Sequence, residues 1–317
     1  MVQVIIDQDI TPTSRLLTQL PDSWETTVGI DNDEYARQIA GYDVALVTSR
    51  IPFSPELIEQ TSQLEAIGKL GTGIDSIDLE AAEDNDISVT HTPGHNALSV
   101  AEHTLCLTLA TLRRLTAARE LIATDRWRDE YPLGSTLSGS TVGIVGFGDV
   151  GKRVGTLLSG FDVEILASDP YVPSIDTELV GGEGASLGTL LKESDVVILT
   201  AELTDETRHI IDQRELSIMD SSAILINTGR GPLVREDALL DALSSNSIAG
   251  AGLDVFSTEP LGSDSELLEL DTVVTTPHVA AMTTEARSEN IDQLASNVTR
   301  IMDGERLSER YIATAKK

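Results

Sequence analysis

The stretch GIVGFGDVGKRVG, residues 143–155, ends a β-rich apolar run and has glycines at positions 146, 148 and 151. A strand-like run, a G-x-G-x-x-G turn and helical periodicity, in this order, are typical of a nucleotide-binding unit. Gly146 makes the tight turn, Gly148 lets the backbone approach a pyrophosphate, and Gly151 lets the helix pack on the strand. The helix N-terminus offers N–H groups and a positive dipole to the phosphates. We therefore predict a dinucleotide-binding unit that begins near the middle of the chain.

A second predicted strand, within DVEILASDP, ends in Asp169, 18 residues after Gly151. An acid at this place accepts hydrogen bonds from the adenosine ribose and repels a 2′-phosphate. We therefore expect NAD(H) to be favoured. NADP(H) stays open, because Ser168 and neighbouring polar groups could accept a phosphate if Asp169 turned away.

Strand-like and helical runs continue to alternate through the second half of the chain. The predicted strands are DVVILTA, SAILINTG, IAGAGLDVF and DTVVTTPH, and the predicted helices are SLGTLLKES, ETRHIIDQRELSIM and REDALLDALSSN. With the two strands above, this pattern predicts a six-stranded parallel sheet with helices on both faces. Ligands bind at the carboxyl ends of such strands. The segments AELT, GRGP, STEP and HVAAMT, which follow four of these strands, are therefore the expected place for chemistry.

The first hundred residues predict a second, smaller α/β unit without a phosphate-binding loop. Its predicted strands are VQVIID, ETTVGI, DVALVTS, LEAIGKLG and ISVTHTPG. Long helices are predicted over residues 99–123 and 284–304. We expect an α/β fold of two Rossmann-like, doubly wound parallel-sheet domains with an active-site cleft between them. Residues 1–98 plus 286–317 would form the flavodoxin-like substrate domain, and residues 99–285 the NAD(P)-binding domain.

Acidic residues far outnumber basic ones: 52 Asp and Glu stand against 22 Lys and Arg, a formal net charge of −30. Such a chain repels nucleic acid and anionic membranes, so neither is expected as a partner. The acids are scattered, and only five lysines occur. Because the Debye length is about 3 Å in 1 M salt, a salt-rich cell would screen this self-repulsion. We therefore expect a protein from a halophile.

No apolar run reaches the roughly 18 residues that a transmembrane helix needs. The N-terminal MVQVIIDQDI lacks the basic region and cleavage site of a signal peptide. The single cysteine, Cys106, cannot form an internal disulfide, and its apolar surroundings favour burial. We expect a cytoplasmic protein without a metal site.

Six motifs resemble the D-isomer-specific 2-hydroxyacid dehydrogenase family, and together they cover nearly the whole chain. They are KLGTGIDSID from Lys69, HNALSVAEHTL from His95, VGIVGFGDVGKRV from Val142, ILINTGRGPLVRE from Ile224, GAGLDVFSTEP from Gly250 and TTPHVAAMTTEA from Thr275. The resemblance implies reversible reduction of 2-keto acids to D-2-hydroxy acids by hydride transfer from NAD(P)H. It also implies a homodimer.

The resemblance places the family's catalytic His at His278, its supporting acid at Glu259 and its substrate-binding Arg at Arg230. Asp254 takes the place of the acid that holds the nicotinamide carboxamide. The turn of Gly71, Thr72 and Gly73 takes the place of the backbone N–H groups that grip the substrate carboxylate. The expected cofactor-binding residues are Gly146, Gly148, Asp149, Val150, Gly151, Asp169, Thr104, Thr204, Thr228 and Asp254.

Keto-acid reduction accounts for these residue types. His holds and gives a proton near neutral pH, and His278 follows a predicted strand, whereas His95 has no acid and Arg beside it. Glu259 can hydrogen-bond the imidazole and favour its protonated form. Arg230 offers a planar fork to the carboxylate and positive charge to the developing alkoxide. One loop position departs from the family pattern: Glu202 stands where Pro is common.

A dinucleotide-sensing binding protein, like the corepressor members of the family, would carry the same His, Glu and Arg. No partner-binding extension or low-complexity tail is visible, which favours the enzyme. Formate dehydrogenase is disfavoured because it carries Gln where this chain has Glu259. Phosphoglycerate dehydrogenase is less favoured because no regulatory domain follows the last helix, but it and glyoxylate or hydroxypyruvate reductase remain alternatives.

The segment TSRIPFSPE, residues 48–56, follows a predicted strand and is expected beside the substrate. Ile51 and Phe53, with Met282, predict an apolar pocket that favours aliphatic 2-keto acids. Arg50 would attract a second carboxylate if it pointed inward. Strand alternation places Arg50 and Ile51 on opposite faces, so we expect Arg50 to point outward.

Overall fold

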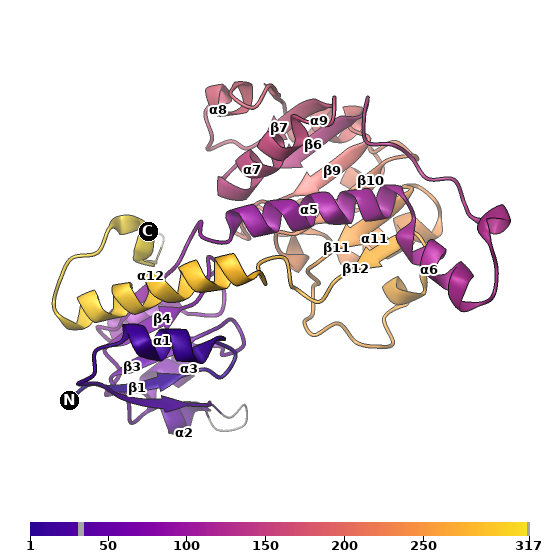
Figure 1. Ribbon diagram of the computed structural model, residues 1–317. Coiled ribbons are helices and arrows are strands. Elements are labelled where there is room, and N and C mark those ends of the chain that lie inside the picture. Colours follow the sequence, from indigo (N-terminus) through magenta and orange to yellow (C-terminus); the bar gives the residue numbers. More distant parts are fainter. Residues whose placement is uncertain (31–34, 316–317) are drawn as a thin grey trace. The chain divides into compact units, whose positions relative to one another are not determined.

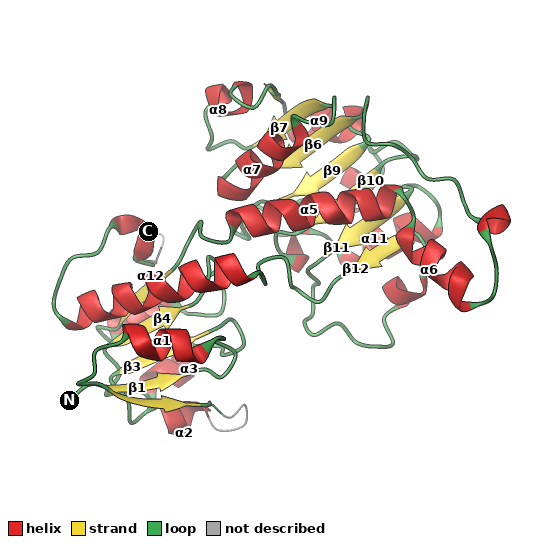
Figure 2. Cartoon of the chain, viewed as in Figure 1, coloured by secondary structure: helices red, strands yellow, loops and turns green. Residues whose placement is uncertain are grey.

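The computed structural model describes residues 1–30 and 35–315 of the chain. These residues form two compact units, unit 1 (residues 1–96 and 282–317) and unit 2 (residues 97–281). Each unit has one parallel β-sheet with helices packed on it (Figures 1 and 2). The predicted fold class, two α/β domains with parallel sheets, is therefore confirmed.

The sheet of unit 1 has five parallel strands in the order β2–β1–β3–β4–β5. These strands are β1 (Gln3–Ile6), β2 (Glu25–Val28), β3 (Val44–Val47), β4 (Ala66–Lys69) and β5 (Ser88–His91). They correspond to the five predicted apolar runs. At the carboxyl edge of the sheet, the last residue of β4, Lys69, lies between Val47 and His91 of the neighbouring strands.

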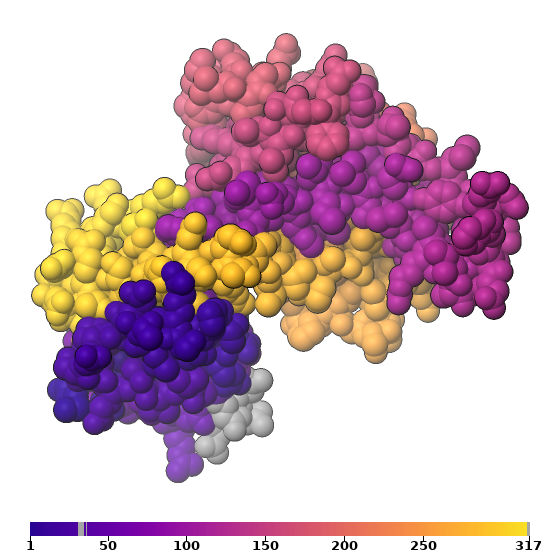
Figure 3. All heavy atoms as spheres, in the orientation of Figure 1, coloured from indigo at the N-terminus to yellow at the C-terminus, as the bar shows by residue number. Residues whose placement is uncertain are grey.

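The C-terminal segment completes unit 1. The helices of unit 1 are α1 (Thr13–Gln19), α2 (Tyr35–Ile39), α3 (Pro55–Glu59), α4 (Leu79–Asp84) and α12 (Thr284–Met302), with a 3-10 turn, η4, at Glu309–Tyr311. The C-terminal segment contributes α12 and η4. Leu294 and Val298 of α12 share a buried cluster with Leu16 of α1 and with strand residues. A Cβ on Gly68 of β4 would lie within 2.9 Å of these two α12 side chains. The yellow C-terminal segment accordingly lies against the indigo N-terminal one (Figure 3).

The sheet of unit 2 has seven parallel strands in the order β12–β11–β10–β9–β6–β7–β8. They are β6 (Thr141–Val145), β7 (Glu164–Ser168), β8 (Glu183–Gly184), β9 (Val196–Leu199), β10 (Ile224–Asn227), β11 (Gly250–Leu253) and β12 (Val273–Thr275). Six of these match the predicted strands, and β8 is additional. Both residues of β8 are exposed, so it leaves no apolar run in the sequence.

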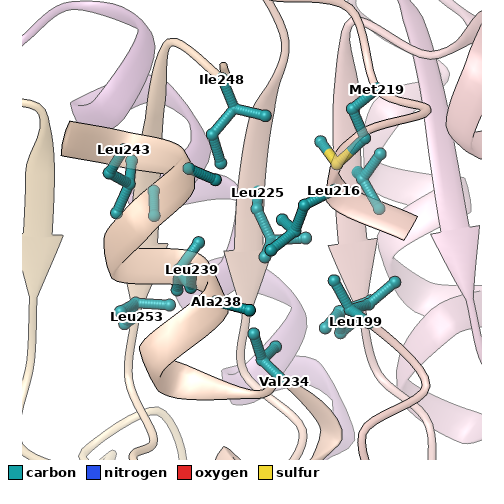
Figure 4. Packing of buried hydrophobic residues seen from close by; sticks show 14 of the residues in the cluster. Leu199, Leu216, Met219, Leu225, Val234, Ala238, Leu239, Leu243, Ile248 and Leu253 are labelled. Carbon is teal, nitrogen blue, oxygen red and sulfur yellow. The ribbon is translucent and has the colours of Figure 1, made fainter. Parts of the chain in front are cut away.

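Two layers of helices cover this sheet. The helices are α5 (Ala97–Leu112), α6 (Leu115–Ala123), α7 (Asp149–Leu158), α8 (Ser174–Glu178), α9 (Leu187–Glu193), α10 (Gln213–Leu216) and α11 (Glu236–Ser244), with 3-10 turns η1 (Arg128–Glu130), η2 (Gly231–Leu233) and η3 (Glu266–Glu269). α5 and α7 pack on one face. On the other face, Leu239 and Leu243 of α11 gather with Leu225 and Leu253 of the strands (Figure 4).

Two of the predicted helices were wrong in extent. The helix expected over residues 99–123 is split into α5 and α6, because Arg114 has a left-handed backbone with φ +46°. The helix expected over residues 206–219 shrinks to α10. Its start is fixed at Asp212 by a capping box with Glu215, and His209 before it has φ +55°. Both interruptions are left-handed residues, which residue periodicity does not reveal.

The expected burial of Cys106 was also wrong, since its side chain is exposed on α5. Residues 98, 102 and 106 recur at a four-residue spacing and are all exposed, so they mark the solvent face of this helix. Among the helices of residues 1–30 and 35–315, none has both the length and the apolar character needed to cross a bilayer.

Candidate active site

The glycine-rich loop of unit 2 follows β6 and is shaped by close backbone contacts. Gly146 has φ +87°, and a Cβ there would lie 2.4 Å from the backbone of Ala201. A Cβ on Gly151 would lie 2.3 Å from the carbonyl oxygen of Gly146. α7 begins at Asp149, after Gly148, without a side-chain cap on its first N–H groups. The shape of the loop and the open start of the helix are compatible with a bound pyrophosphate.

Asp169 follows β7 and is joined to this loop. Its Oδ2 accepts a hydrogen bond from Phe147 N at 2.7 Å, and its Oδ1 accepts one from Tyr171 N at 2.9 Å. The hydroxyl of Tyr171 donates to Glu206 Oε2 at 2.7 Å. That hydrogen bond and the charges of Glu206 and Asp169 raise the pKa of Tyr171. The sequence indicated Asp169 but not this second carboxylate, which the Tyr171 bridge brings to the same place.

The three predicted cofactor-binding threonines differ in exposure. Thr204, in the loop after β9, is half-buried, and its N–H donates to Thr207 Oγ1 at 2.7 Å. Thr228 follows β10, and its hydroxyl lies 2.7 Å from that of Thr104 on α5. Thr104 is fully buried and also donates to the Val100 carbonyl. The expected direct cofactor contact of Thr104 is therefore corrected: its hydroxyl supports Thr228 from beneath.

His278 follows β12 in a left-handed backbone conformation with φ +53°. Its N–H donates to the Asp254 carbonyl at 2.8 Å. The Asp254 carboxylate, which is completely buried, accepts hydrogen bonds from the next two backbone N–H groups, those of Val279 (2.9 Å) and Ala280 (3.0 Å). Asp254 thus holds both sides of His278, an arrangement that compensates for an unfavourable backbone conformation.

The Asp254 carboxylate is itself part of a buried network. Thr276 Oγ1 donates to Asp254 Oδ1 at 2.6 Å, and His103 Nε2 lies 2.9 Å from Thr276 Oγ1. Burial opposes ionisation of Asp254, but the hydrogen bonds from His103, Thr276 and the backbone hold its pKa below the usual value. His103 and Thr276 were missed from the sequence. His103 lies within the motif HNALSVAEHTL and Thr276 within TTPHVAAMTTEA, but the sequence assigned no role to either residue.

His278 and Glu259 are in direct contact. His278 Nδ1 lies 2.8 Å from Glu259 Oε2, and Glu259 Oε1 accepts a hydrogen bond from Phe256 N at 3.1 Å. Burial would raise the pKa of Glu259, yet the hydrogen bond and charge of His278, the Phe256 N–H and the charge of Arg230 lower it. An ionised Glu259 accepts a hydrogen bond from Nδ1–H, which leaves Nε2, on a side chain 44 % exposed, to exchange a proton.

Arg230 follows β10. Its charge acts on Glu259 because the loop after β10 contacts the loop after β11. A Cβ on Gly231 would lie only 1.8 Å from the Phe256 carbonyl oxygen, so only glycine allows this approach. The side chain of Asn227 fixes the loop by donating to the Arg230 carbonyl at 2.9 Å and accepting from Gly229 N. The structure thus gathers the charges of Arg230, Glu259 and His278 at the carboxyl edge of one sheet.

The turn predicted to bind a carboxylate lies in unit 1, after β4. Gly71 has φ +100°, and its N–H donates to Thr92 Oγ1 at 2.7 Å. This N–H is therefore occupied, which corrects the expectation for Gly71. Within the described part of the chain, no hydrogen bond uses the N–H groups of Thr72 and Gly73. These two groups remain available as donors.

The predicted apolar pocket was wrong. Ile51 and Phe53 are 0 % and 1 % exposed and belong to the hydrophobic core of unit 1, whereas Met282 is exposed. The outward orientation of Arg50 was also wrong, because its guanidinium lies 2.5 Å from the buried carboxylate of Asp7. The segment begins after β3 has ended at Val47, so strand alternation did not apply to it.

The Arg50–Asp7 contact also determines the charge at this edge of unit 1. Burial alone would raise the pKa of Asp7, but hydrogen bonds from Arg50 and Thr48 hold it below its usual value. Asp9 lies 3.3 Å from the same guanidinium. Arg50 is therefore already matched by two carboxylates.

Comparison with known proteins defines the class to which this fold and site belong. Residues 105–280 match the family model described as D-isomer specific 2-hydroxyacid dehydrogenase, NAD binding domain. A hydroxypyruvate reductase of Thermotoga maritima is 36 % identical over 276 residues, which are 86 % of this chain and 89 % of the relative. The chain therefore belongs to the D-isomer-specific 2-hydroxyacid dehydrogenase family.

Other relatives differ in length and in the activity they are named for. A D-3-phosphoglycerate dehydrogenase of Archaeoglobus fulgidus is 36 % identical over 83 % of this chain, and the match spans only 50 % of that relative. The structure of D-lactate dehydrogenase from Aquifex aeolicus, complexed with NAD and lactic acid, superposes with a TM-score of 0.86. That comparison has 28 % identity and covers 99 % of this chain and all of the other.

Proposed function

We propose that this protein is an NAD-dependent dehydrogenase that interconverts 2-keto acids and D-2-hydroxy acids. The observation that carries the proposal is the 2.8 Å contact between His278 Nδ1 and Glu259, with the charge of Arg230 acting on the same carboxylate. These groups lie at the carboxyl edge of a sheet whose glycine loop fits a dinucleotide. Family membership supports the same reaction class.

In this mechanism His278 is the general acid and base. A reduced nicotinamide dinucleotide, held by the glycine loop and Asp169, would supply the hydride for the keto carbon. His278 Nε2 gives a proton to the keto oxygen during reduction and takes it back during oxidation. Glu259 acts through His278: by accepting a hydrogen bond from Nδ1–H it fixes the ring orientation, and its charge stabilises the imidazolium.

Arg230 is the side chain of unit 2 that we assign to the substrate. We assign Arg230 to the keto oxygen and carboxylate, because a guanidinium donates two parallel hydrogen bonds and stabilises a developing alkoxide. The N–H groups of Thr72 and Gly73, which donate to no acceptor among the residues that the structure describes, are assigned to a carboxylate. Asp254 is assigned first to holding the His278 segment, since its Oδ1 already receives Thr276 Oγ1 and Val279 N.

We further propose that the substrate is a 2-keto acid without a second negative charge, such as glyoxylate or hydroxypyruvate. Arg50 is the residue that could have bound a second anionic group, but its guanidinium forms ion pairs with Asp7 and Asp9. The Thermotoga maritima relative, matched over 89 % of its length, is named hydroxypyruvate reductase.

Oxidation of NADH at 340 nm, measured with glyoxylate, hydroxypyruvate, pyruvate, 2-ketohexanoate, oxaloacetate and phosphohydroxypyruvate, tests both proposals. We expect turnover, with an uncharged side chain preferred about tenfold or more in kcat/KM. Preference for oxaloacetate or phosphohydroxypyruvate would overturn the substrate class. NADH binding without turnover of any keto acid would overturn the activity and favour a dinucleotide-sensing protein.

We propose that NAD(H) is preferred over NADP(H). A 2′-phosphate would face Asp169 and, through the Tyr171 bridge, Glu206. Two like charges about 4 Å apart repel by about 1 kcal/mol in water and about 4 kcal/mol near a protein surface. We therefore expect kcat/KM to favour NADH by about tenfold or more in low salt.

The variant Asp169→Asn should reduce this preference, because it removes the charge and keeps an acceptor for Phe147 N. Glu178→Gln, which removes an exposed carboxylate on α8, is the matched control and should leave the preference unchanged. If the wild-type protein has the same kcat/KM with NADPH as with NADH in both low and high salt, Asp169 does not select the cofactor.

We also propose a homodimer whose stability depends on salt. Trp127 and Leu133 follow α6 and are 68 % and 91 % exposed, and Leu115 and Ile122 of α6 are exposed as well. Exposed apolar residues that gather in one region mark interaction surfaces. Each copy has a net charge of −30, so two copies repel unless salt shortens the Debye length from about 10 Å at 0.1 M to about 3 Å at 1 M.

Light scattering should therefore detect dimers at 1 M salt and dissociation, with lower resistance to urea, after dialysis to 0.1 M. The double variant Trp127→Glu, Leu133→Glu should be monomeric at 1 M salt. Leu179→Glu, at an equally exposed apolar position after α8, should remain dimeric. A wild-type dimer that keeps its stability in low salt would contradict the expected adaptation to a salt-rich cell.

A further inference from the structure

One face of α5 packs along strand β11 in a matched register. A Cβ on Gly250 would lie 3.3 Å from Cγ2 of Thr111, and a Cβ on Gly252 would lie 3.3 Å from Cβ of Leu107. Four residues of a helix rise about 6 Å, and two residues of a strand rise about 6.6 Å. Each four-residue step along α5 therefore matches a two-residue step along β11, and the glycines let the two elements lie close together.

The next step in this register brings His103 to Asp254. His103 precedes Leu107 by four residues, and Asp254 follows Gly252 by two. His103 Nε2 lies 3.4 Å from Asp254 Oδ1 and 2.9 Å from Thr276 Oγ1. All of these residues belong to unit 2. The place of the His103 ring is therefore set by the packing of a long helix on a buried strand.

The direction of each hydrogen bond in this group follows from its chemistry. Although burial opposes ionisation, hydrogen bonds hold the pKa of Asp254 below its usual value, so its carboxylate is ionised at neutral pH and only accepts. Thr276 Oγ1, at 2.6 Å, therefore donates its single hydrogen to Asp254 Oδ1. The contact between the same hydroxyl and His103 is then a hydrogen bond that Nε2–H donates. His103 thus carries a proton on Nε2.

Asp254 passes this constraint to the segment that carries His278. Its carboxylate accepts from Val279 N and Ala280 N, and its carbonyl accepts from His278 N at 2.8 Å. The same His278 N–H also lies 3.0 Å from the Thr276 carbonyl oxygen. A left-handed residue such as His278 keeps its conformation only where its surroundings hold it. A displacement of about 1 Å at a reacting group can lower a rate about 100-fold.

We propose that His103 is a positioning residue for His278, which it orients through hydrogen bonds from its Nε2–H to Thr276 Oγ1 and from Thr276 to the Asp254 carboxylate. The inference rests on the proposed dehydrogenase function and adds to it a residue that touches no reacting atom. Nε2 of His103 keeps its hydrogen throughout turnover. Loss of His103 should therefore lower kcat and leave KM for the keto acid nearly unchanged.

Substitution of His103 by Leu removes the donor and keeps most of the side-chain volume. We expect kcat to fall about 3- to 10-fold, the effect of one hydrogen bond, with KM for the preferred 2-keto acid within about twofold of wild type. His103→Gln should recover most of kcat, because its amide NH₂ can donate to Thr276 from nearly the place of the ring Nε2. Glu102→Leu, at the neighbouring exposed position of α5, is the matched control and should leave both constants unchanged.

The route through Thr276 is tested by a double variant. Thr276→Val removes the bridging hydroxyl and keeps the shape of the side chain, so it should lower kcat at least as much as His103→Leu. Once the bridge is gone, His103→Leu should cause no further loss. Losses that multiply in the double variant, or an unchanged kcat in folded His103→Leu, would overturn the proposal.

A spectroscopic measurement needs no turnover. Long-range ¹H–¹⁵N spectra of protein labelled with [¹⁵N]histidine show which ring nitrogens carry a proton in each of the five histidines. We expect a proton on Nε2 of His103, whose signal is assigned by its loss from His103→Gln. The ring signals of His278 should move in His103→Leu and stay in place in His103→Gln and Glu102→Leu.

An unprotonated Nε2 at neutral pH would overturn the proposal, because Thr276 would then donate to His103 instead of Asp254. Unmoved His278 signals in His103→Leu would overturn it as well. A protonated Nε2 and moving His278 signals in a protein that turns over no keto acid would preserve the hydrogen-bond chain and overturn the proposed activity instead.

Discussion

Replacement of His278 by Gln is expected to lower kcat by about 10²- to 10⁴-fold, the usual contribution of a positioned general acid–base group. Gln cannot exchange a proton with the keto oxygen, and it loses the imidazolium that Glu259 stabilises at 2.8 Å. The glycine loop and Asp169 belong to other strands, so the dissociation constant of NADH should stay near its wild-type value. Steady-state rates and NADH fluorescence titration measure the two quantities.

The matched control is His209→Gln. His209 is an exposed histidine with φ +55°, close to the +53° of His278. Both substitutions therefore put Gln into a left-handed position, and only one removes the proposed acid. Equal losses of activity in the two variants would assign the effect to the backbone. Near-normal turnover of His278→Gln would remove His278 from the mechanism.

Replacement of Arg230 by Gln should lower kcat/KM by about 10²- to 10³-fold, since removal of one preorganised donor to an oxyanion has this effect. Arg230→Lys should recover only part of it, because an ammonium lacks the planar fork that matches a carboxylate. The control is Arg235→Gln, which removes an exposed guanidinium that pairs with Asp212 at 3.0 Å. If Arg230→Gln loses as much thermal stability as Arg235→Gln but keeps its kcat/KM, the role of Arg230 is structural.

A double variant, His278→Gln with Arg230→Gln, tests whether the two side chains act in the same step. If His278 and Arg230 act on one keto oxygen in a single step, their losses should not add in the double variant. Strict additivity of the two free-energy changes would indicate independent steps. Both single variants keep the Gly231–Phe256 approach, because neither substitution adds a side chain at the glycine.

Much of the fold could be predicted because the information is local. Buried parallel strands leave short apolar runs, and Gly146 and Gly151 mark a turn with no room for a Cβ. The errors in helix and strand prediction arose where a single residue redirects the backbone or where a strand is too short to form a pattern. Arg114 divides a continuous helical pattern by its left-handed φ of +46°, and β8 is too short and too exposed to leave a pattern.

The site was predictable to the extent that motifs encode it. His278, Glu259 and Arg230 were named from their motifs, and the structure brings their charges together. The supporting contacts were not predictable, because they join distant segments: His103 meets Thr276 across 173 residues. The inferred pocket failed for a related reason, since an apolar residue such as Phe53 after a strand fits a core as well as a binding site.

The return of the C-terminal segment to unit 1 has a consequence for synthesis on the ribosome. Residues 97–281 are contiguous, so unit 2 can fold as soon as they have emerged. Residues 1–96 leave the ribosome before unit 2, but the face of their sheet that carries Gly68 and Leu46 is covered by α12, which emerges after unit 2. During translation the nascent first unit therefore displays an uncovered apolar face for the time needed to make roughly 200 further residues, about 10 to 40 seconds at ordinary elongation rates. Chaperone capture of nascent chains is expected to be strongest in that interval and to end once α12 is available.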